Sequence, residues 1–211
     1  NDIILLFNKT DSSVLNIKNF SLNEGELRRF ANENNIKIDV VVPLLRGGNI
    51  PGTYLAYKLN VLRICPVQLK YIFEKDVAKL QLIQGVNKNI VTEKNPVFLL
   101  VEGNHCYGTS ANYAAKHLKE EFPNCKIIYA ASNMDYNYKD AVKNAEVNFF
   151  GRYNNDCEEL SKEECEKHGI VFGKFNIFPW ENLEEEKTTM SFKQFDYNDY
   201  DETVKNSKTL E

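Results

Sequence analysis

Apolar runs alternate with amphipathic stretches along the first 150 residues of the chain. The runs are rich in β-branched residues and nearly continuous, which is typical of strands buried on both faces. They lie at 38–45, 96–101, 126–131 and 147–150. Between them, apolar residues recur with helical spacing at 21–35, 51–59 and 109–121, where Ser21 is the expected cap of the first helix. This alternation predicts an α/β domain with a mainly parallel sheet.

The remaining segments give weaker signals. A short apolar run at 3–7 predicts an edge strand, and 61–72 predicts one or two more strands. Residues 74–95 have no strong period, so we expect a mobile flap there. A short polar helix is expected at 160–167. From Glu181 the chain turns polar and acidic, which divides it into one domain at 1–181 and a surface tail at 182–211.

Composition narrows the class of protein. Of the 211 residues, 43% are hydrophobic and 27% charged, as in an ordinary soluble protein. The net charge of −4 argues against a nucleic-acid partner, which usually requires a basic face. The five cysteines form no CxxC pair, so we expect reduced thiols and a cytoplasmic location. No apolar run approaches the about 18 residues that a membrane span needs.

Two glycine-bearing loops follow predicted strands and lead into predicted helices. They are Arg46–Asn49 and Glu102–Ser110. Ligands of open α/β sheets bind outside the carboxyl ends of the strands, and a helix N-terminus attracts anions. Arg46 adds a forked cation suited to phosphate. Either loop alone is as well explained by a tight turn or a helix cap, but the pair predicts an anion site.

Three segments resemble the purine phosphoribosyltransferases. Residues 43–59 (PLLRGGNIPGTYLAYKL) are similar to their diphosphate loop, and 98–110 (FLLVEGNHCYGTS) to their motif for phosphoribosyl diphosphate (PRPP). Residues 175–181 (FNIFPWE) are similar to their C-terminal base-binding segment. The resemblance implies a type I phosphoribosyltransferase fold, with a small hood from parts of 1–20, 67–95 and 170–181. It also implies Mg²⁺-PRPP and a purine-type base as substrates, diphosphate as a product, and a homodimer.

The same resemblance assigns roles to individual residues. Glu102 is expected beside the ribose hydroxyls and the metal, and Cys106 stands at the position of the catalytic aspartate, so both are candidate catalytic residues. The residues expected at the phosphates of PRPP are Arg46, Gly47, Gly48, Lys70, Tyr107, Gly108, Thr109 and Ser110. Those expected at the base are Ser132, Phe175 and Asn176.

The chain departs from the family pattern at several of these positions. Gly103 replaces a second acidic residue, and the thiol of Cys106 is a weaker acceptor than a carboxylate. Tyr107 replaces a small threonine, and Ser132 lies near the position of a base-binding lysine. The leading hypothesis is a phosphoribosyltransferase. A non-catalytic PRPP or nucleotide sensor of the same fold is the alternative, and a transferase for another nitrogenous acceptor is a third option.

The three histidines remain outside this scheme, and His168, beside Gly169, is expected at the surface. His105 and Cys106 are adjacent, but neighbours on an extended chain point in different directions, so we do not expect a thiolate–imidazole pair. We expect His105 to be a loop residue near the ligand and His117 to lie on the surface of its helix.

Overall fold

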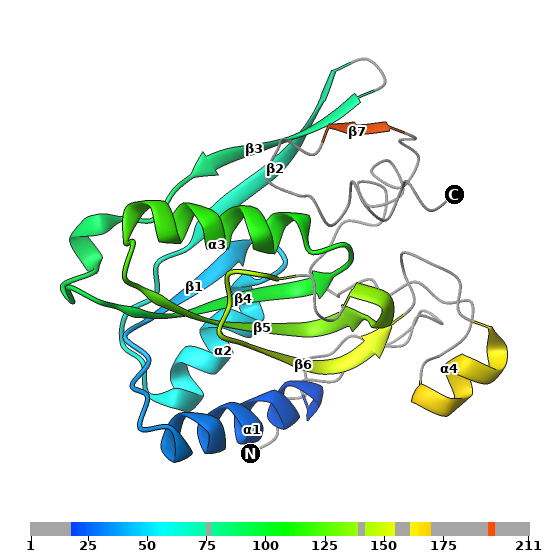
Figure 1. Ribbon diagram of the computed structural model, residues 1–211, viewed down its shortest axis with the longest axis horizontal. Helices are drawn as coiled ribbons and strands as arrows, with labels where there is room; N and C mark the ends of the chain where they lie inside the picture. The colour runs from blue at the N-terminus through cyan, green and yellow to red at the C-terminus, as the bar shows by residue number, and fades with distance from the viewer. Residues whose placement is uncertain (1–17, 75–76, 139–141, 155–160, 170–193, 197–211) are drawn as a thin grey trace, which may run out of the picture.

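The computed structural model describes residues 18–74, 77–138, 142–154, 161–169 and 194–196 (Figure 1). Its helices are α1 (Lys18–Glu33), α2 (Asn49–Leu59), α3 (Thr109–Glu121) and α4 (Lys162–His168), with short 3-10 turns η1 (Lys88–Ile90) and η2 (Tyr136–Tyr138). Its strands are β1 (Val40–Leu45), β2 (Val67–Glu74), β3 (Val77–Gln84), β4 (Val97–His105), β5 (Lys126–Asp135), β6 (Val147–Asn154) and β7 (Gln194–Asp196).

The strands form one sheet in the order β6-β5-β4-β1-β2-β3-β7. Every pairing is parallel except the β2–β3 hairpin. The prediction of an α/β fold with a mainly parallel sheet is therefore confirmed. Helix α3 covers one face of the sheet, and α1 and α2 cover the other (Figure 1).

The three central strands are buried on both faces, as their continuous apolar runs require. Val40 and Val42 of β1 pack into the layer beneath α3, whereas Val41 packs into the layer beneath α1 and α2. Phe98 and Leu100 of β4 alternate with Leu99 in the same way. Since residues on both faces are excluded from water, the strands lack the apolar–polar alternation of a half-exposed sheet.

The region predicted as a flap contains a regular strand instead. Strand β3 pairs antiparallel with β2 from Gln84 to Val77, and this hairpin reaches away from the body of the molecule (Figure 1). Leu80 is buried and Leu82 packs against the core, whereas Lys79 is exposed. The apolar–polar alternation in β3 is only a few residues long, so it did not predict a strand. The pairing with β2 stabilises the extended conformation.

Several element boundaries also differ from the predictions. Helix α1 begins at Lys18, so Ser21 lies inside the helix and is not its cap. Strands β4, β5 and β6 each run four residues past the predicted end, because parallel pairing continues through their polar carboxyl ends. The predicted strand at 3–7 and nearly all of the predicted tail lie outside the described residues, as do parts of the predicted hood. In the part of the chain that the structure describes, no helix is long and apolar enough to cross a bilayer.

Candidate functional site

The loop after β1 and the loop after β4 lie against each other. Strands β1 and β4 are parallel neighbours, with Pro43 opposite Val101, so both loops leave the same edge of the sheet. A Cβ atom on Gly103 would lie 2.8 Å from the carbonyl oxygen of Gly47. A Cβ atom on Gly48 would come closer still, 2.2 Å from the carbonyl oxygen of Val101. The fold thus brings together the two segments that the sequence singled out as an anion site.

The N-terminus of α3 opens onto this edge without a side-chain cap. The residue before the helix, Gly108, has φ of 81°, a left-handed conformation that glycine adopts without strain. The N–H groups of the first helical turn have no partner within the helix. The hydroxyl oxygen of Thr109 is buried and has no hydrogen-bond partner among the described residues. These groups make the turn a set of hydrogen-bond donors suited to an anion.

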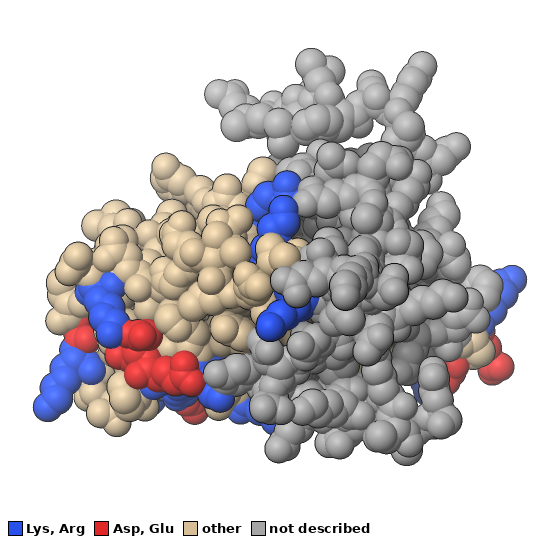
Figure 2. Space-filling view, turned by 90° about the horizontal axis from the view of Figure 1, so that it is seen from above, with Lys and Arg blue, Asp and Glu red and all other residues tan. Residues whose placement is uncertain are grey.

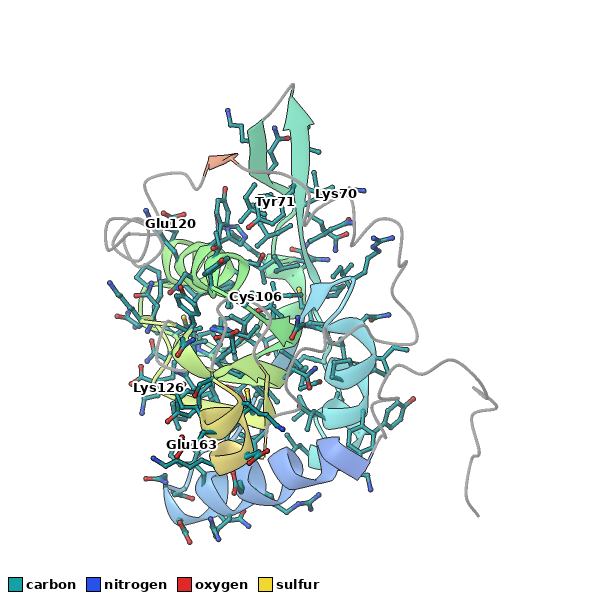
Figure 3. All side chains as sticks on the ribbon, turned by 90° about the vertical axis from the view of Figure 1, so that its right-hand side faces the viewer. Lys70, Tyr71, Cys106, Glu120, Lys126 and Glu163 are labelled. Carbon is teal, nitrogen blue, oxygen red and sulfur yellow. The ribbon has the colours of Figure 1, made fainter. Side chains whose placement is uncertain are left out.

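Of the other predicted phosphate and base residues, Arg46 lies in the loop after β1, Lys70 on β2 and Ser132 on β5. Arg46 is exposed and follows a cis peptide bond from Leu45. Lys70 is exposed on β2, and Figure 3 shows it on the hairpin, with Cys106 at the end of β4. Ser132 is buried on β5, and its hydroxyl finds no partner in the described part of the chain. Phe175 and Asn176 lie outside the described residues.

Charge is unevenly distributed on the face that Figure 2 shows. Lys and Arg side chains lie near the middle of the view, beside the residues that are not described, and acidic side chains lie with further basic ones at the lower left (Figure 2). A local basic surface is compatible with an anionic ligand even though the whole chain is acidic.

The side chains around Cys106 turn toward the 3-10 turn η2. The ring of Tyr107 packs edge-on against Tyr138, with 4.8 Å between the ring centroids. The Sγ atom of Cys106, a half-buried free thiol, lies 4.0 Å from Nδ2 of Asn104. The substitution of tyrosine for a small residue at position 107 therefore ties the candidate phosphate loop to the turn that follows β5.

Glu102 belongs to a buried chain of hydrogen bonds that the sequence did not reveal. The hydroxyl of Tyr129 lies 2.8 Å from Oε2 of Glu102 and 2.9 Å from Nδ1 of His105. The other ring nitrogen of His105, Nε2, lies 3.0 Å from the backbone carbonyl of Tyr138. Tyr129 and His105 are both fully buried. The chain thus connects the edge of the candidate site to η2 through the protein interior.

Burial changes the acidity of every member of this chain. It raises the pKa of Glu102 to about 7, although the neighbouring hydroxyl of Tyr129 acts in the opposite direction. It lowers the pKa of His105 to about 4, and it raises the pKa of Tyr129 well above its ordinary value. Each shift has the sign expected when the charged form loses water.

These residues do not fit a magnesium ion held by the protein. Mg²⁺ prefers ionised carboxylates and keeps an octahedral set of oxygen ligands. Oε2 of Glu102 is engaged by Tyr129, and position 103 offers no second carboxylate. Among the described residues, no cluster of three or more His, Cys, Asp or Glu side chains can hold a metal.

The hydrogen-bonded residues His105 and Tyr129 were not predicted as site residues. His105 lies within β4 and is fully buried, so the expectation of a loop residue was wrong. His117 is also less exposed than expected, since its Nε2 accepts a hydrogen bond from the N–H of Val86 at 3.1 Å. The sequence contained one signal of this network, which was the position of His105 shortly after a predicted buried strand. Tyr129 reads as an ordinary core residue, and only the pairing of β4 with β5 places it beside Glu102.

The fold is that of the type I phosphoribosyltransferases. A purine phosphoribosyltransferase from Pyrococcus horikoshii superposes with a TM-score of 0.55 at 18% identity, covering 82% of this chain and 97% of its own. A hypothetical protein from Neisseria gonorrhoeae with bound ppGpp superposes with a TM-score of 0.57 at 14% identity, covering 87% and 97%.

A hypoxanthine phosphoribosyltransferase from Staphylococcus aureus gives 0.51 at 14% identity, covering 71% of this chain and 79% of its own. No family model matches the sequence, and no curated protein matches it either. At these identities the likeness establishes the fold.

Proposed function

We propose that this protein binds a phosphorylated ribose at the β4–α3 loop and transfers the phosphoribosyl group of Mg²⁺-PRPP to a purine-type base, with release of diphosphate. The observation that carries the proposal is the uncapped N-terminus of α3, with the buried Thr109 hydroxyl, beside the Gly47 loop. An anion placed there accepts hydrogen bonds from the backbone and lies at the positive end of a helix.

In this proposal the site residues divide by the part of the ligand that they contact. The backbone of 107–110 and the Thr109 hydroxyl hold the 5′-phosphate, and the loop of Arg46 holds the diphosphate. The metal ion enters with PRPP as part of the substrate. Ser132, whose buried hydroxyl has no partner among the described residues, donates to the base. The residues assigned to the ligand from the resemblance alone are Lys70, Phe175 and Asn176.

A second candidate function is a sensor that binds PRPP or a purine nucleotide without turnover. It is favoured by the hydrogen bond that joins Glu102 to buried Tyr129, by Gly103 and by the thiol at position 106. The Neisseria protein of similar fold holds ppGpp, which supports a nucleotide as the ligand here. Such a ligand needs the phosphate cradle but not the acid–base group that a transfer reaction uses.

One pair of experiments separates the two functions. Calorimetry measures binding of PRPP, GMP and ppGpp, and a diphosphate assay measures turnover of Mg²⁺-PRPP with each purine base. Release of diphosphate together with a new nucleotide supports the transferase. Binding without release supports the sensor. Failure of all three ligands to bind contradicts both functions.

A variant at the helix N-terminus tests where the ligand binds. Thr109→Val keeps the shape of the side chain but removes its hydroxyl, so we expect affinity for the ligand to fall about tenfold, the effect of one hydrogen bond to a charged group. Thr92→Val is the matched control, because Thr92 precedes the amino end of β4, opposite the site. Equal affinities of Thr109→Val and wild type would place the ligand elsewhere.

A further inference from the structure

The geometry of the hydrogen-bonded chain from Glu102 to Tyr138 determines which atom of each contact carries the proton. The carbonyl oxygen of Tyr138 can only accept, so Nε2 of His105 must carry a hydrogen and donate it. If the imidazole is neutral, Nδ1 is then an acceptor, and the single hydroxyl proton of Tyr129 must be donated to it. That leaves the Tyr129 oxygen facing Oε2 of Glu102 at 2.8 Å without a proton to give.

This last contact is a hydrogen bond only if Glu102 supplies the proton. The complete chain therefore runs from the carboxylic acid of Glu102 to Tyr129, from Tyr129 to His105, and from His105 to the Tyr138 carbonyl. The other complete arrangement is an ion pair of carboxylate and imidazolium, in which both donors point the opposite way. With Glu102 ionised and His105 neutral, one of the two contacts is left with no hydrogen between its electronegative atoms.

Burial decides between the two complete arrangements. Both ring nitrogens of His105 are buried with the rest of its side chain, and desolvation disfavours an imidazolium there. Outside the chain, the Cys106 thiol on the β4–α3 loop also raises the pKa of Tyr129. The neutral arrangement, with the proton on Glu102, is favoured, in agreement with the raised pKa of that residue.

We propose that His105 and Tyr129 are positioning residues that keep Glu102 an uncharged acid, so that the site binds the phosphorylated ribose without a divalent cation held by the protein. His105 acts by accepting the Tyr129 proton, which would otherwise stabilise a carboxylate. Oε1 of Glu102 remains an uncharged acceptor for a ribose hydroxyl. The role in ligand binding rests on the proposed function, but the protonation of Glu102 can be tested without it.

The protonation of Glu102 is measurable without any ligand. We would label glutamate carboxyl carbons with ¹³C and assign Glu102 by its loss in Glu102→Gln. At about pH 6 the wild-type resonance should be that of a neutral acid, because this lies below the pKa of about 7. A fully ionised wild-type Glu102 at this pH overturns the proposal.

Two variants distinguish this role from simple structural support. His105→Phe keeps a buried ring but removes both ring nitrogens, so Tyr129 donates to Glu102 and the carboxyl should ionise at lower pH. Adding Tyr129→Phe to His105→Phe removes that donor, so in the double variant the carboxyl should stay neutral to higher pH than in His105→Phe. A purely structural role predicts that the double variant shifts further in the same direction as His105→Phe, and that result would overturn the proposal.

Ligand binding supplies the second measurement. With GMP as the probe, the affinity of the wild type should be the same in Mg²⁺ and in EDTA. In His105→Phe, the ionised Glu102 opposes the anionic ligand, so affinity at neutral pH should fall about tenfold in EDTA and recover in Mg²⁺. A wild-type affinity that requires Mg²⁺ counts against the proposal. Absence of GMP binding counts against the proposed function only, because the carboxyl spectrum still decides the state of Glu102.

Discussion

At position 103 the backbone of a neighbouring loop occupies the space that a side chain would need. A Cβ atom there would meet the oxygen, carbonyl carbon and Cα of Gly47 at 2.8, 2.9 and 3.2 Å. These are backbone atoms, so they cannot turn away as the end of a flexible side chain can. The close packing of the two loops therefore leaves no room at position 103 for the second acidic residue of the phosphoribosyltransferase motif.

Restoring an acid at this position should damage the protein. We expect Gly103→Asp to lower the free energy of unfolding by about 1–3 kcal/mol, because overpacking forces the Gly47 loop to move. Urea denaturation measures the change. Gly25→Ala in α1, where nothing lies within 4 Å of the added carbon, is the control and should be neutral or slightly stabilising. An undiminished stability of Gly103→Asp would show that the loop yields readily.

Glu102 and His105 make opposite contributions to the dependence of stability on pH. The pKa of Glu102 rises from 4.5 to about 7 on folding, so between these values the folded state holds more protons and stability falls with pH. The pKa of His105 falls from 6.5 to about 4, so in that window the unfolded state holds more protons and stability rises with pH. From about pH 4.5 to 6.5 the two contributions cancel.

Removing the carboxyl of Glu102 should make the contribution of His105 to the pH dependence of stability measurable. In Glu102→Gln the amide still donates to Tyr129, so only the His105 contribution remains, and stability should rise by roughly 2 kcal/mol between about pH 4 and 6.5. Urea unfolding at several pH values, with the wild type flat in the same interval, checks this. Glu102→Gln combined with His105→Gln should be flat again. A slope that persists in the double variant would assign the effect to other groups.

At the scale of elements, one arginine joins segments that are far apart in the sequence. Arg63 lies between α2 and β2, and its guanidinium forms a fork with Glu93, with Nη1–Oε2 at 2.8 Å and Nη2–Oε1 at 2.5 Å. It also donates to Thr92 at 2.8 Å. The fork lowers the pKa of Glu93 to about 2. It thus fixes the connection that enters β4 from the amino end.

Lysine cannot reproduce this fork, so Arg63→Lys should lower the free energy of unfolding by about 1 kcal/mol. The loss should shrink in high salt and as the pH falls through the pKa of Glu93, since a protonated carboxyl no longer pairs. Urea denaturation at two salt concentrations measures it. Glu120→Gln breaks an exposed pair with Lys116 at 3.7 Å and should have almost no effect. Equal losses in the two variants would mean that the fork is no stronger than a surface pair.

The elements themselves were largely predictable where their apolar patterns were long. Helix α3 has the bounds that its periodicity predicted, and β1 and β4 follow from runs of apolar residues. Strand β3 was missed because only its pairing with β2 stabilises an extended chain there. The ends of β4 and β5 were missed because they carry polar residues among the apolar ones, so the continuous apolar pattern stops before the strands do.

At the scale of the whole molecule, the order of strands and helices sets the fold, and the fold sets the site. Parallel pairing of β1 with β4 and β4 with β5 brings three carboxyl ends to one edge. The likeness to phosphoribosyltransferases extends over most of the chain, although sequence identity is below a fifth. A fold can therefore be shared where few individual residues are, because many apolar sequences fill the same core.

The sequence by itself determined the α/β class and the two loops of the candidate anion site, because apolar periodicity and glycine placement are local signals. Only the tertiary structure decided which contacts the residues of those loops make. The contact of Gly103 with Gly47 and the chain from Glu102 through Tyr129 to His105 join residues from different strands. Hydrogen bonds and close contacts of this kind depend on distances between strands, which no local pattern in the sequence specifies.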